Sequence, residues 1–207
     1  MGRFELERLN QLKSKGTTPF TTVIETGTCL GYSTQDLSQY FKTVHTVEIQ
    51  EPLYRNAREK FAHNPNIHCH NGDSVSVLKN LASTVKERAV FYLDAHWSGD
   101  NTVDWEASRW KGYPVETGCR GVDKAPENQN PLHEELKVIM ENYTQEVIVY
   151  IDDMDKFDTD GKGMKDFGFK GEDWSHLTVN KMLDIVKGRV IDVVRFNDQM
   201  IVHLGAQ

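Results

Sequence analysis

The amino-acid sequence predicts an α/β fold with a doubly wound, mostly parallel sheet and an antiparallel hairpin near its C-terminal end. Three observations lead to this prediction: short β-branched segments alternate with helical segments, successive strand segments end in acidic residues, and two late β-rich segments flank a two-residue turn. Alternating strands and helices favour parallel β-α-β units. With 207 residues, of which 38% are hydrophobic, the chain is long enough for one core, so we expect residues 1–207 to form a single domain.

The first predicted strand leads into a turn that contains two glycines. Residues 23–34, VIETGTCLGYST, pass from β-branched residues through Glu25, Gly27 and Gly31 into a polar, helix-compatible stretch. Glycines at a strand end let the backbone approach a ligand, and amides at the start of the next helix supply donors. The turn lacks the third glycine of the dinucleotide fingerprint and the Lys-Ser/Thr pair of a phosphate loop. The turn therefore indicates a nucleotide-type site, but it disfavours the cofactors that a dinucleotide fingerprint or a phosphate loop would bind.

Three further strand segments each end in an acid. They span residues 41–48, 66–73 and 89–94 and end at Glu48, Asp73 and Asp94. An acid after the second strand can accept two hydrogen bonds from a ribose diol. Carboxylates at four consecutive strand ends are expected of a parallel sheet that binds a ligand at its carboxyl edge.

The remaining segments continue the alternation of helix and strand. Helices are predicted over residues 51–62, 74–85 and 132–141. Residues 147–151 form the unbroken apolar run of a strand buried on both faces, and two acids follow it. The final β-rich runs, residues 189–196 and 199–204, predict a hairpin around a two-residue turn.

Two segments are predicted to cover the sheet edge. Residues 1–18 contain apolar residues at helical spacing and predict an amphipathic helix over the sheet or the ligand site. Residues 98–130 are too polar and glycine-rich for a core element, and a loop of this length is usually functional or disordered. Their aromatic residues argue against plain disorder. We predict a substrate lid in which Trp97, Trp105 and Trp110 contact the acceptor.

The motifs of the chain resemble those of class I S-adenosylmethionine-dependent methyltransferases from about residue 21 onward. The resemblance is carried by ETGTCLGYST at 25–34, LDAHWSG at 93–99, PLHEEL at 131–136 and IDD at 151–153. It implies a Rossmann-like sheet and S-adenosylmethionine as cofactor. It also implies which residues bind this cofactor: Glu25, Gly27 and Gly31 at the methionine part, Glu48 at the ribose hydroxyls, Asp73 and Ser74 at the adenine, and Thr28, Tyr32, Ser33 and Asp94 as further contacts.

Three carboxylates are predicted to converge beside the cofactor. Asp94 ends the fourth strand, and Asp152 and Asp153 end the fifth, so they meet if these strands are neighbours. Hard oxygen ligands without cysteine suit Mg²⁺ or Mn²⁺. An alcohol needs such a cation or a general base before it can accept a methyl group at neutral pH. Alternatively, Asp152 and Asp153 cap the following turn while Asp94 bonds the cofactor.

His96, two residues after Asp94, is the predicted general base, and we assign both residues to the catalytic group. The unperturbed histidine pKa of ~6.5 suits removal of a proton from the acceptor near neutral pH. The alternative is a structural histidine bonded to a backbone carbonyl.

The acids and His96 are similar to those of metal-dependent methyltransferases that act on deoxysugars such as rhamnose or on macrolide glycosides, including glycan-decorating enzymes of large algal viruses. We therefore predict an O-methyltransferase that acts on a sugar hydroxyl of a glycan or glycoside, with the lid tryptophans stacking on CH-rich sugar faces. The alternatives are a catechol-like small-molecule O-methyltransferase and a non-catalytic cofactor-binding module.

Composition limits the partners of the protein. A net charge of -7 disfavours binding to a nucleic-acid backbone, which needs clustered Lys and Arg. No apolar run approaches the ~20 residues of a membrane span, and the first residues lack the apolar core of a signal peptide. Three cysteines without CxxC spacing suggest neither a disulfide framework nor a zinc site. We expect a cytoplasmic protein, in the host cytoplasm if the source is viral, without a membrane or nucleic-acid partner; a homo-oligomer is compatible with the sequence.

Overall fold

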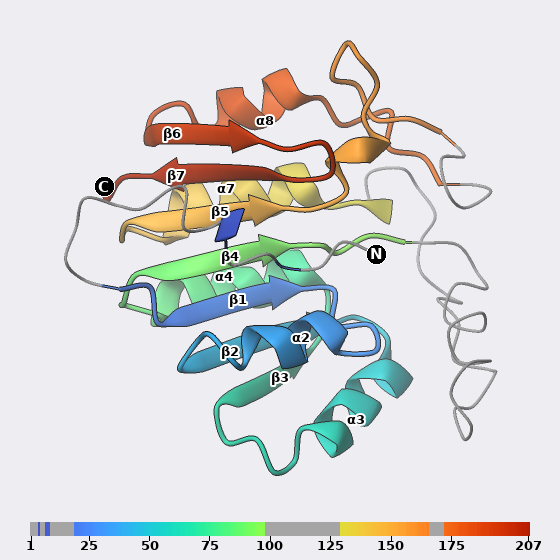
Figure 1. Ribbon diagram of the computed structural model, residues 1–207, viewed down its shortest axis with the longest axis vertical. Helices are drawn as coiled ribbons and strands as arrows, with labels where there is room; N and C mark the ends of the chain where they lie inside the picture. Colours follow the sequence, from blue (N-terminus) through green and yellow to red (C-terminus); the bar gives the residue numbers. More distant parts are fainter. Residues whose placement is uncertain (1–3, 5–6, 9–18, 98–128, 166–171) are drawn as a thin grey trace.

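The computed structural model describes residues 4, 7–8, 19–97, 129–165 and 172–207. Within these ranges, seven strands form one sheet in the order β3-β2-β1-β4-β5-β7-β6 (Figure 1). The strands are β1 (Thr22–Thr26), β2 (Thr43–Glu48), β3 (Ile67–Asn71), β4 (Ala89–Leu93), β5 (Val147–Ile151), β6 (Val190–Arg195) and β7 (Met200–Leu204). Strands β1 to β5 pair in parallel, whereas β7 runs antiparallel to both β5 and β6. The predicted fold class is confirmed.

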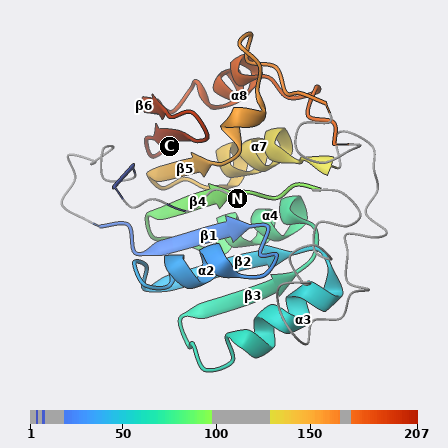
Figure 2. The same ribbon diagram turned by 45° about the vertical axis from the view of Figure 1, so that its right-hand side comes forward.

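Helices cover both faces of this sheet (Figure 2). The helical elements are α2 (Tyr32–Leu37), α3 (Glu51–Lys60), α4 (Ser74–Thr84), α7 (Leu132–Asn142), α8 (Val179–Val186) and the short 3-10 helix η2 (Met154–Lys156). Helices α3, α4 and α7 lie close to their predicted bounds. Helix α8 is an addition to the prediction; it is capped by Thr178, whose hydroxyl accepts a hydrogen bond from the Lys181 amide.

Successive strand residues face opposite sides of the sheet and build two cores. Ile24, Phe91 and Val149 belong to the core that includes α4, α7 and α8. Their strand neighbours Val23 and Val90 belong to the core of the opposite face, with side chains from α2 and α3. The parallel strands are buried on both faces, which explains their nearly unbroken apolar sequences.

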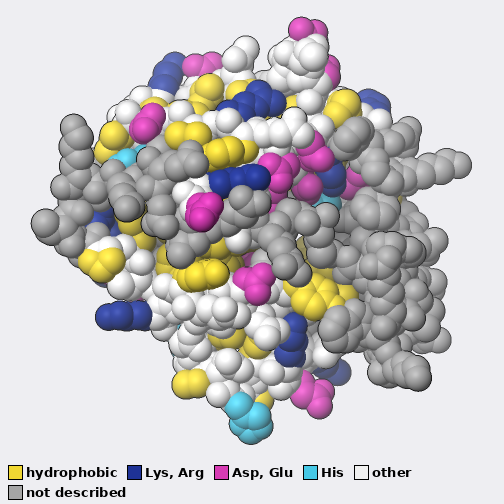
Figure 3. All heavy atoms as spheres, in the orientation of Figure 1, with side chains coloured by type: hydrophobic (Ala, Val, Ile, Leu, Met, Phe, Trp, Pro, Cys, Tyr) yellow, Lys and Arg dark blue, Asp and Glu magenta, His cyan; other side chains and the backbone are white. Residues whose placement is uncertain are grey.

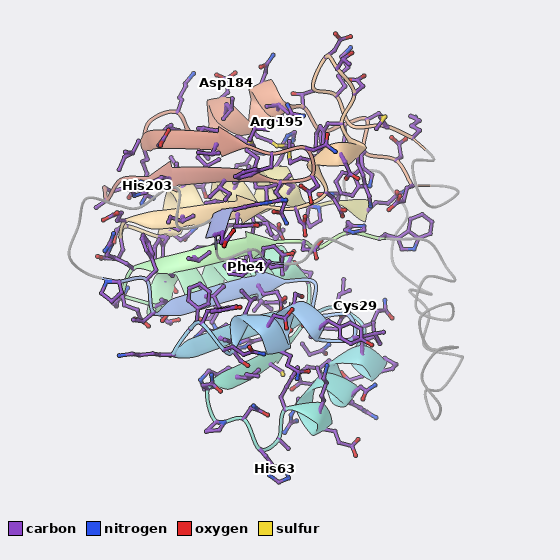
Figure 4. The ribbon with its side chains drawn as sticks, in the orientation of Figure 1. Phe4, Cys29, His63, Asp184, Arg195 and His203 are labelled. Atoms are coloured by element: carbon purple, nitrogen blue, oxygen red, sulfur yellow. The ribbon has the colours of Figure 1, made fainter. Side chains whose placement is uncertain are left out.

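Part of the N-terminal segment also lies over the sheet. The Phe4 ring is 5.9 Å from the ring of Tyr92 and 5.1 Å from that of Tyr150, measured between centroids. Figure 4 shows Phe4 in front of β4, near the middle of the sheet. Arg8 forms an ion pair with Asp198. Most of the helix predicted within residues 1–18 lies outside the described residues, as do residues 98–128 of the predicted lid.

The register of the parallel strands brings their carboxyl ends level. Thr26 of β1 pairs with Val47 of β2 and Leu93 of β4, and Leu93 pairs with Ile151 of β5. The residues that follow these strands therefore begin at one edge of the sheet. No helix in the described ranges is both long and apolar enough to cross a membrane.

Candidate functional site

The turn after β1 requires glycine at two positions. Gly27 has a φ of +85°, and a Cβ atom there would lie 2.5 Å from the backbone oxygen of Asp94. Gly31 has a φ of +68°, and its Cβ atom would lie 2.8 Å from the Phe61 ring. Both φ values are in the left-handed region that glycine adopts without steric cost. The turn from β1 is therefore packed directly against the end of β4.

Three backbone amides of this turn donate hydrogen bonds to carbonyl oxygens of the protein itself. The Gly27 and Thr28 amides donate to the backbone oxygen of Val47 over 3.0 and 3.1 Å, and the Gly31 amide donates to that of Thr28 over 2.7 Å. These three amide protons already have acceptors within the protein, so the ligand contacts predicted for Gly27, Thr28 and Gly31 would depend on close approach and not on these amides.

Glu25 is a fully buried carboxylate beneath the turn. Its Oε2 atom accepts hydrogen bonds from the hydroxyls of Thr34 and Thr46 over 2.5 and 2.6 Å. Burial raises the pKa of Glu25 above its usual value, although hydroxyls of Ser33, Thr34 and Thr46 oppose that change. Among the described residues, no donor reaches its Oε1 atom. This free oxygen can accept a hydrogen bond from a ligand.

Glu48, at the end of β2, is tied to the same turn. Its Oε2 atom accepts the Cys29 amide and its Oε1 atom the Gln50 amide, both over 2.8 Å. Burial raises its pKa to about 7 despite these bonds. Figure 4 shows Cys29 at the turn between β1 and α2. Each carboxylate oxygen keeps a further lone pair with which it can accept a ligand hydroxyl.

Three of the predicted cofactor contacts have other neighbours in the structure. Asp73 is exposed and caps α4, because its Oδ1 atom accepts the Ser76 amide over 2.9 Å. The Ser74 hydroxyl bonds the carboxylate of Glu135. The ring of Tyr32 is partly exposed, 5.0 Å from the Lys60 ammonium. The assignment of these three residues to the cofactor stays a prediction.

Asp94, His96 and Asp153 form the central group of the site, with one ligand-type atom of each lying within 4.8 Å of the others. The His96 Nε2 atom is 2.9 Å from Asp153 Oδ2 and 4.0 Å from Asp94 Oδ1. Acidic side chains gather on the face where β4 and β5 end (Figure 3). Two carboxylates and an imidazole are suitable ligands for a divalent cation.

This group differs from the predicted trio in one member. Asp152 accepts hydrogen bonds from the Tyr92 hydroxyl over 2.5 Å and from the Gln199 amide group over 3.2 Å. Its Oδ1 atom also accepts the Asp153 amide. Asp152 therefore supports the end of β5 in the structure, while His96 occupies the position of the third ligand-type group.

The acids of the site are crowded enough to perturb one another. Burial, followed by the charges of Asp152 and Asp153, raises the pKa of Asp94 well above its usual range. Burial opposes ionisation of Asp153 as well, but His96 and Lys156 together lower its pKa. The excess of negative charge at Asp94 is what a bound cation would neutralise.

His96 lies among charged groups of both signs. Burial and the charge of Lys156 lower the pKa of His96, but the contacts with Asp153 and Glu172 have a larger, opposite effect. The net result is a pKa raised to about 9. The His96 Nδ1 atom is 3.4 Å from Glu172 Oε1, and Lys156 Nζ is 3.1 Å from the same oxygen. His96 is therefore an imidazolium at neutral pH when no cation is bound.

A pocket lies between this group and helix α7. Its lining includes Asp94, His96, Asp153, Glu135 and Trp174. Sequence reasoning missed Glu135 and Trp174. The signal for Glu135 was its position on the apolar face of α7, three residues after Leu132, whereas the neighbouring Glu134 is exposed and pairs with Lys137 over 2.5 Å.

The predicted acceptor residues are described only in part. Trp97 is buried, and its amide donates to the backbone oxygen of Gln129 over 2.6 Å. Trp105 and Trp110 lie outside the described residues.

Comparison with solved structures identifies the fold. The PH0226 protein from Pyrococcus horikoshii aligns with a TM-score of 0.54 at 14% identity, over 98% of this chain and 88% of that one. A putative caffeoyl-CoA O-methyltransferase from Staphylococcus aureus aligns with a TM-score of 0.51 at 13% identity, over 97% of this chain and 79% of that one. A fibrillarin/Nop5p complex gives a TM-score of 0.51 at 10% identity, over 97% of this chain and 79% of that one.

At the level of sequence, no protein-family model and no curated protein matches the chain. Such low identities to solved structures establish the fold alone. The chain has the Rossmann-like fold of the methyltransferases among these structures, with a mostly parallel sheet and a C-terminal antiparallel pair.

Proposed function

We propose that the protein is an S-adenosylmethionine-dependent O-methyltransferase that methylates a hydroxyl of a sugar, such as a deoxysugar of the rhamnose type in a glycan or glycoside. One observation carries this proposal: the turn at Gly27 packs against the backbone of Asp94, the first member of the Asp94-His96-Asp153 group. A methyl donor bound at the turn and a hydroxyl bound at the group would therefore be neighbours.

The turn offers buried acceptors for the donor molecule. S-adenosylmethionine supplies a methyl group on a positively charged sulfur. The Oε1 atom of Glu25, which no described residue contacts, would accept a hydrogen bond from the methionine part. Glu48 would accept the ribose hydroxyls with the lone pairs that the Cys29 and Gln50 amides leave free. Gly27 and Gly31 have no side chains, so the ligand can approach the protein backbone closely at these positions.

The Asp94-His96-Asp153 group would activate the acceptor. Asp94 and Asp153 are suited to hold Mg²⁺ or Mn²⁺ through their carboxylate oxygens. Such a cation, when bound, lowers the pKa of a hydroxyl. The Nε2 atom of His96 is the nitrogen that faces Asp94 and Asp153. One nitrogen cannot bind a cation and accept a proton at the same time, so His96 is either a ligand or a base.

We assign His96 the role of base. As an imidazolium it cannot accept a proton, so this role requires that the charges of Asp94 and Asp153 be neutralised. His96→Gln should then lower kcat by about 10²–10⁴ and leave the affinity for Mn²⁺ unchanged. Loss of Mn²⁺ affinity in this variant would instead make His96 a ligand.

A small-molecule O-methyltransferase is the second candidate. The fold similarity to the putative caffeoyl-CoA O-methyltransferase favours it. Catechol and methyl α-L-rhamnopyranoside therefore serve as competing acceptors in the test.

The proposal is tested in two steps. Calorimetry should detect binding of S-adenosylhomocysteine, and Glu48→Ala should weaken it by at least about tenfold, since even one hydrogen bond to a charged group contributes about 1.5–3 kcal/mol. Glu51→Gln, at an exposed neighbouring position, is the control and should bind normally. Transfer of a labelled methyl group is then measured with each acceptor, with Mn²⁺, Mg²⁺ or EDTA. Tight binding of NAD without binding of S-adenosylhomocysteine would overturn the proposal.

A further inference from the structure

The pocket beside the Asp94-His96-Asp153 group extends toward α7. Its cavity volume is about 10 Å³, which is roughly the space that one water molecule needs. Sites for whole small molecules usually measure about 300–1,000 Å³. The pocket is therefore of a size for one part of an acceptor and not for the whole of it.

Two of its lining residues have buried polar atoms without partners. Glu135 and Trp174 are only 1% and 3% exposed. Within the described part of the chain, neither Glu135 Oε1 nor Trp174 Nε1 has a hydrogen-bond partner. A buried polar atom without a partner is costly and rare in native proteins, and an unfilled ligand position is one explanation for it. Because both residues line one small pocket, a single polar group there is the simplest partner for both atoms.

Both residues are held in place by contacts outside the pocket. Hydroxyls of Ser74 and Thr26 bond the carboxylate of Glu135. The Trp174 amide donates to the backbone oxygen of Met164 over 3.0 Å. A Cβ atom at Gly163 would lie 1.8 Å from the Trp174 backbone oxygen, so only glycine permits this approach. The two residues are thus fixed parts of the pocket wall.

We propose that Glu135 and Trp174 bind a second hydroxyl of the acceptor, adjacent to the hydroxyl that is methylated. A hydroxyl fits both groups, because it can donate to the Glu135 carboxylate and accept from the Trp174 N–H. An ammonium group has no lone pair for the indole, and a carboxylate would be repelled by Asp94 and Asp153. The acceptor class is therefore a polyol with neighbouring hydroxyls. This inference rests on the proposed function for its link to methyl transfer.

The indole N–H of Trp174 provides a direct test by NMR. In ¹⁵N-labelled protein with S-adenosylhomocysteine and Mg²⁺, Trp174→Phe identifies the resonance. Titration with methyl α-L-rhamnopyranoside should shift this resonance to saturation. Glu135→Gln should weaken the titration, and Trp174→Phe should raise the KM for the same sugar by about tenfold, the loss expected for one hydrogen bond. Binding of S-adenosylhomocysteine should be unchanged in both variants.

Tyr143→Phe is the matched control. It removes another buried donor, which bonds the backbone oxygen of Glu87 before the start of β4, away from the pocket. This variant should leave the sugar titration unchanged. An unshifted Trp174 resonance throughout the titration, the result if only water fills the pocket, would overturn the inference.

The failure of this inference differs from the failure of the proposed function. A shifted Trp174 resonance without any methyl transfer would support the polyol site and reject the transferase. Methyl transfer to the sugar, together with an unshifted resonance and an unchanged KM in Trp174→Phe, would support the transferase and reject the polyol site.

Discussion

The Nε2 atom of His96 lies 2.9 Å from Oδ2 of Asp153, although the two residues follow different strands. Asp153 reaches His96 from a left-handed backbone conformation, with a φ of 58° and a ψ of 27°. Aspartate is one of the few residues that adopt this conformation with modest strain. The backbone turn separates two consecutive acids, so that Asp152 bonds Tyr92 and Gln199 while Asp153 faces His96.

The first prediction concerns the protonation of His96 in the presence of EDTA. Its imidazole should titrate near pH 9 by NMR, and Asp153→Asn should lower that pKa because burial and Lys156 then dominate. Asp155→Asn, at an exposed position nearby, is the control and should leave it unchanged. Because the folded pKa exceeds the unfolded value of 6.5, the contribution to stability is complete below pH 6.5 and is lost as the pH rises through about 9. A midpoint near 6.5 in the wild type would contradict this account.

The second prediction distinguishes the two consecutive acids as cation ligands. Asp153→Asn should weaken Mn²⁺ binding by at least about 100-fold, because loss of a ligand should exceed the ~10–100-fold loss seen for residues that only orient a ligand. Asp152→Asn should weaken it far less, since its carboxylate is engaged with Tyr92 and Gln199. Calorimetry or electron paramagnetic resonance provides the measurement. Equal losses in the two variants would restore the trio of Asp94, Asp152 and Asp153.

The third prediction concerns the contact between the turn and the end of β4. Gly27→Ala should lower the free energy of unfolding by more than the about 1–2 kcal/mol of left-handed backbone strain, because the new Cβ atom also meets Asp94. It should also abolish binding of S-adenosylhomocysteine. Gly188→Ala is the control, since no atom lies within 4 Å of its Cβ position. Thermal and denaturant unfolding of the pair measure the difference, and similar midpoints would refute the packing argument.

The fourth prediction concerns the stability cost of Glu135. Burial raises its pKa from 4.5 to about 7, so the folded protein favours its protonated form. The cost is absent below pH 4.5 and grows to about 3 kcal/mol as the pH rises through 7. Glu135→Gln removes this ionisable group. The free energy of unfolding of the variant, relative to that of the wild type, should therefore increase between pH 5 and pH 8. Glu134→Gln, at an exposed position, should show no such trend in denaturant unfolding.

The sequence was most informative where burial is uniform. The apolar run at residues 147–151 predicted β5 with the bounds that the structure has, because both faces of that strand are covered. Glu25, Glu48 and Asp94 could be placed near one another from the sequence because each lies at or next to the carboxyl end of a strand in the same parallel sheet. Helix α8 was missed although five of its eight residues are apolar, because it is short and follows an irregular segment.

The rest of the site depends on contacts between distant segments. Lys156, Glu172 and Trp174 come near His96 only after the chain that follows β5 has folded back toward the residues that follow β4. Nothing in their local sequence indicates this approach. The choice between Glu134 and Glu135 depends on the rotation of α7 about its axis, which is set by the packing of Leu136 and Ile139 into the core.

The position of β7 between β5 and β6 has a consequence for synthesis on the ribosome. Strands β1 to β5 can pair as they emerge, but β5 keeps one open edge until β7, which follows β6 in the sequence, has been made. An exposed apolar strand edge is a template for association with other chains. Nascent chains stalled before Met200 should therefore be the aggregation-prone species, and the ones that chaperones retain.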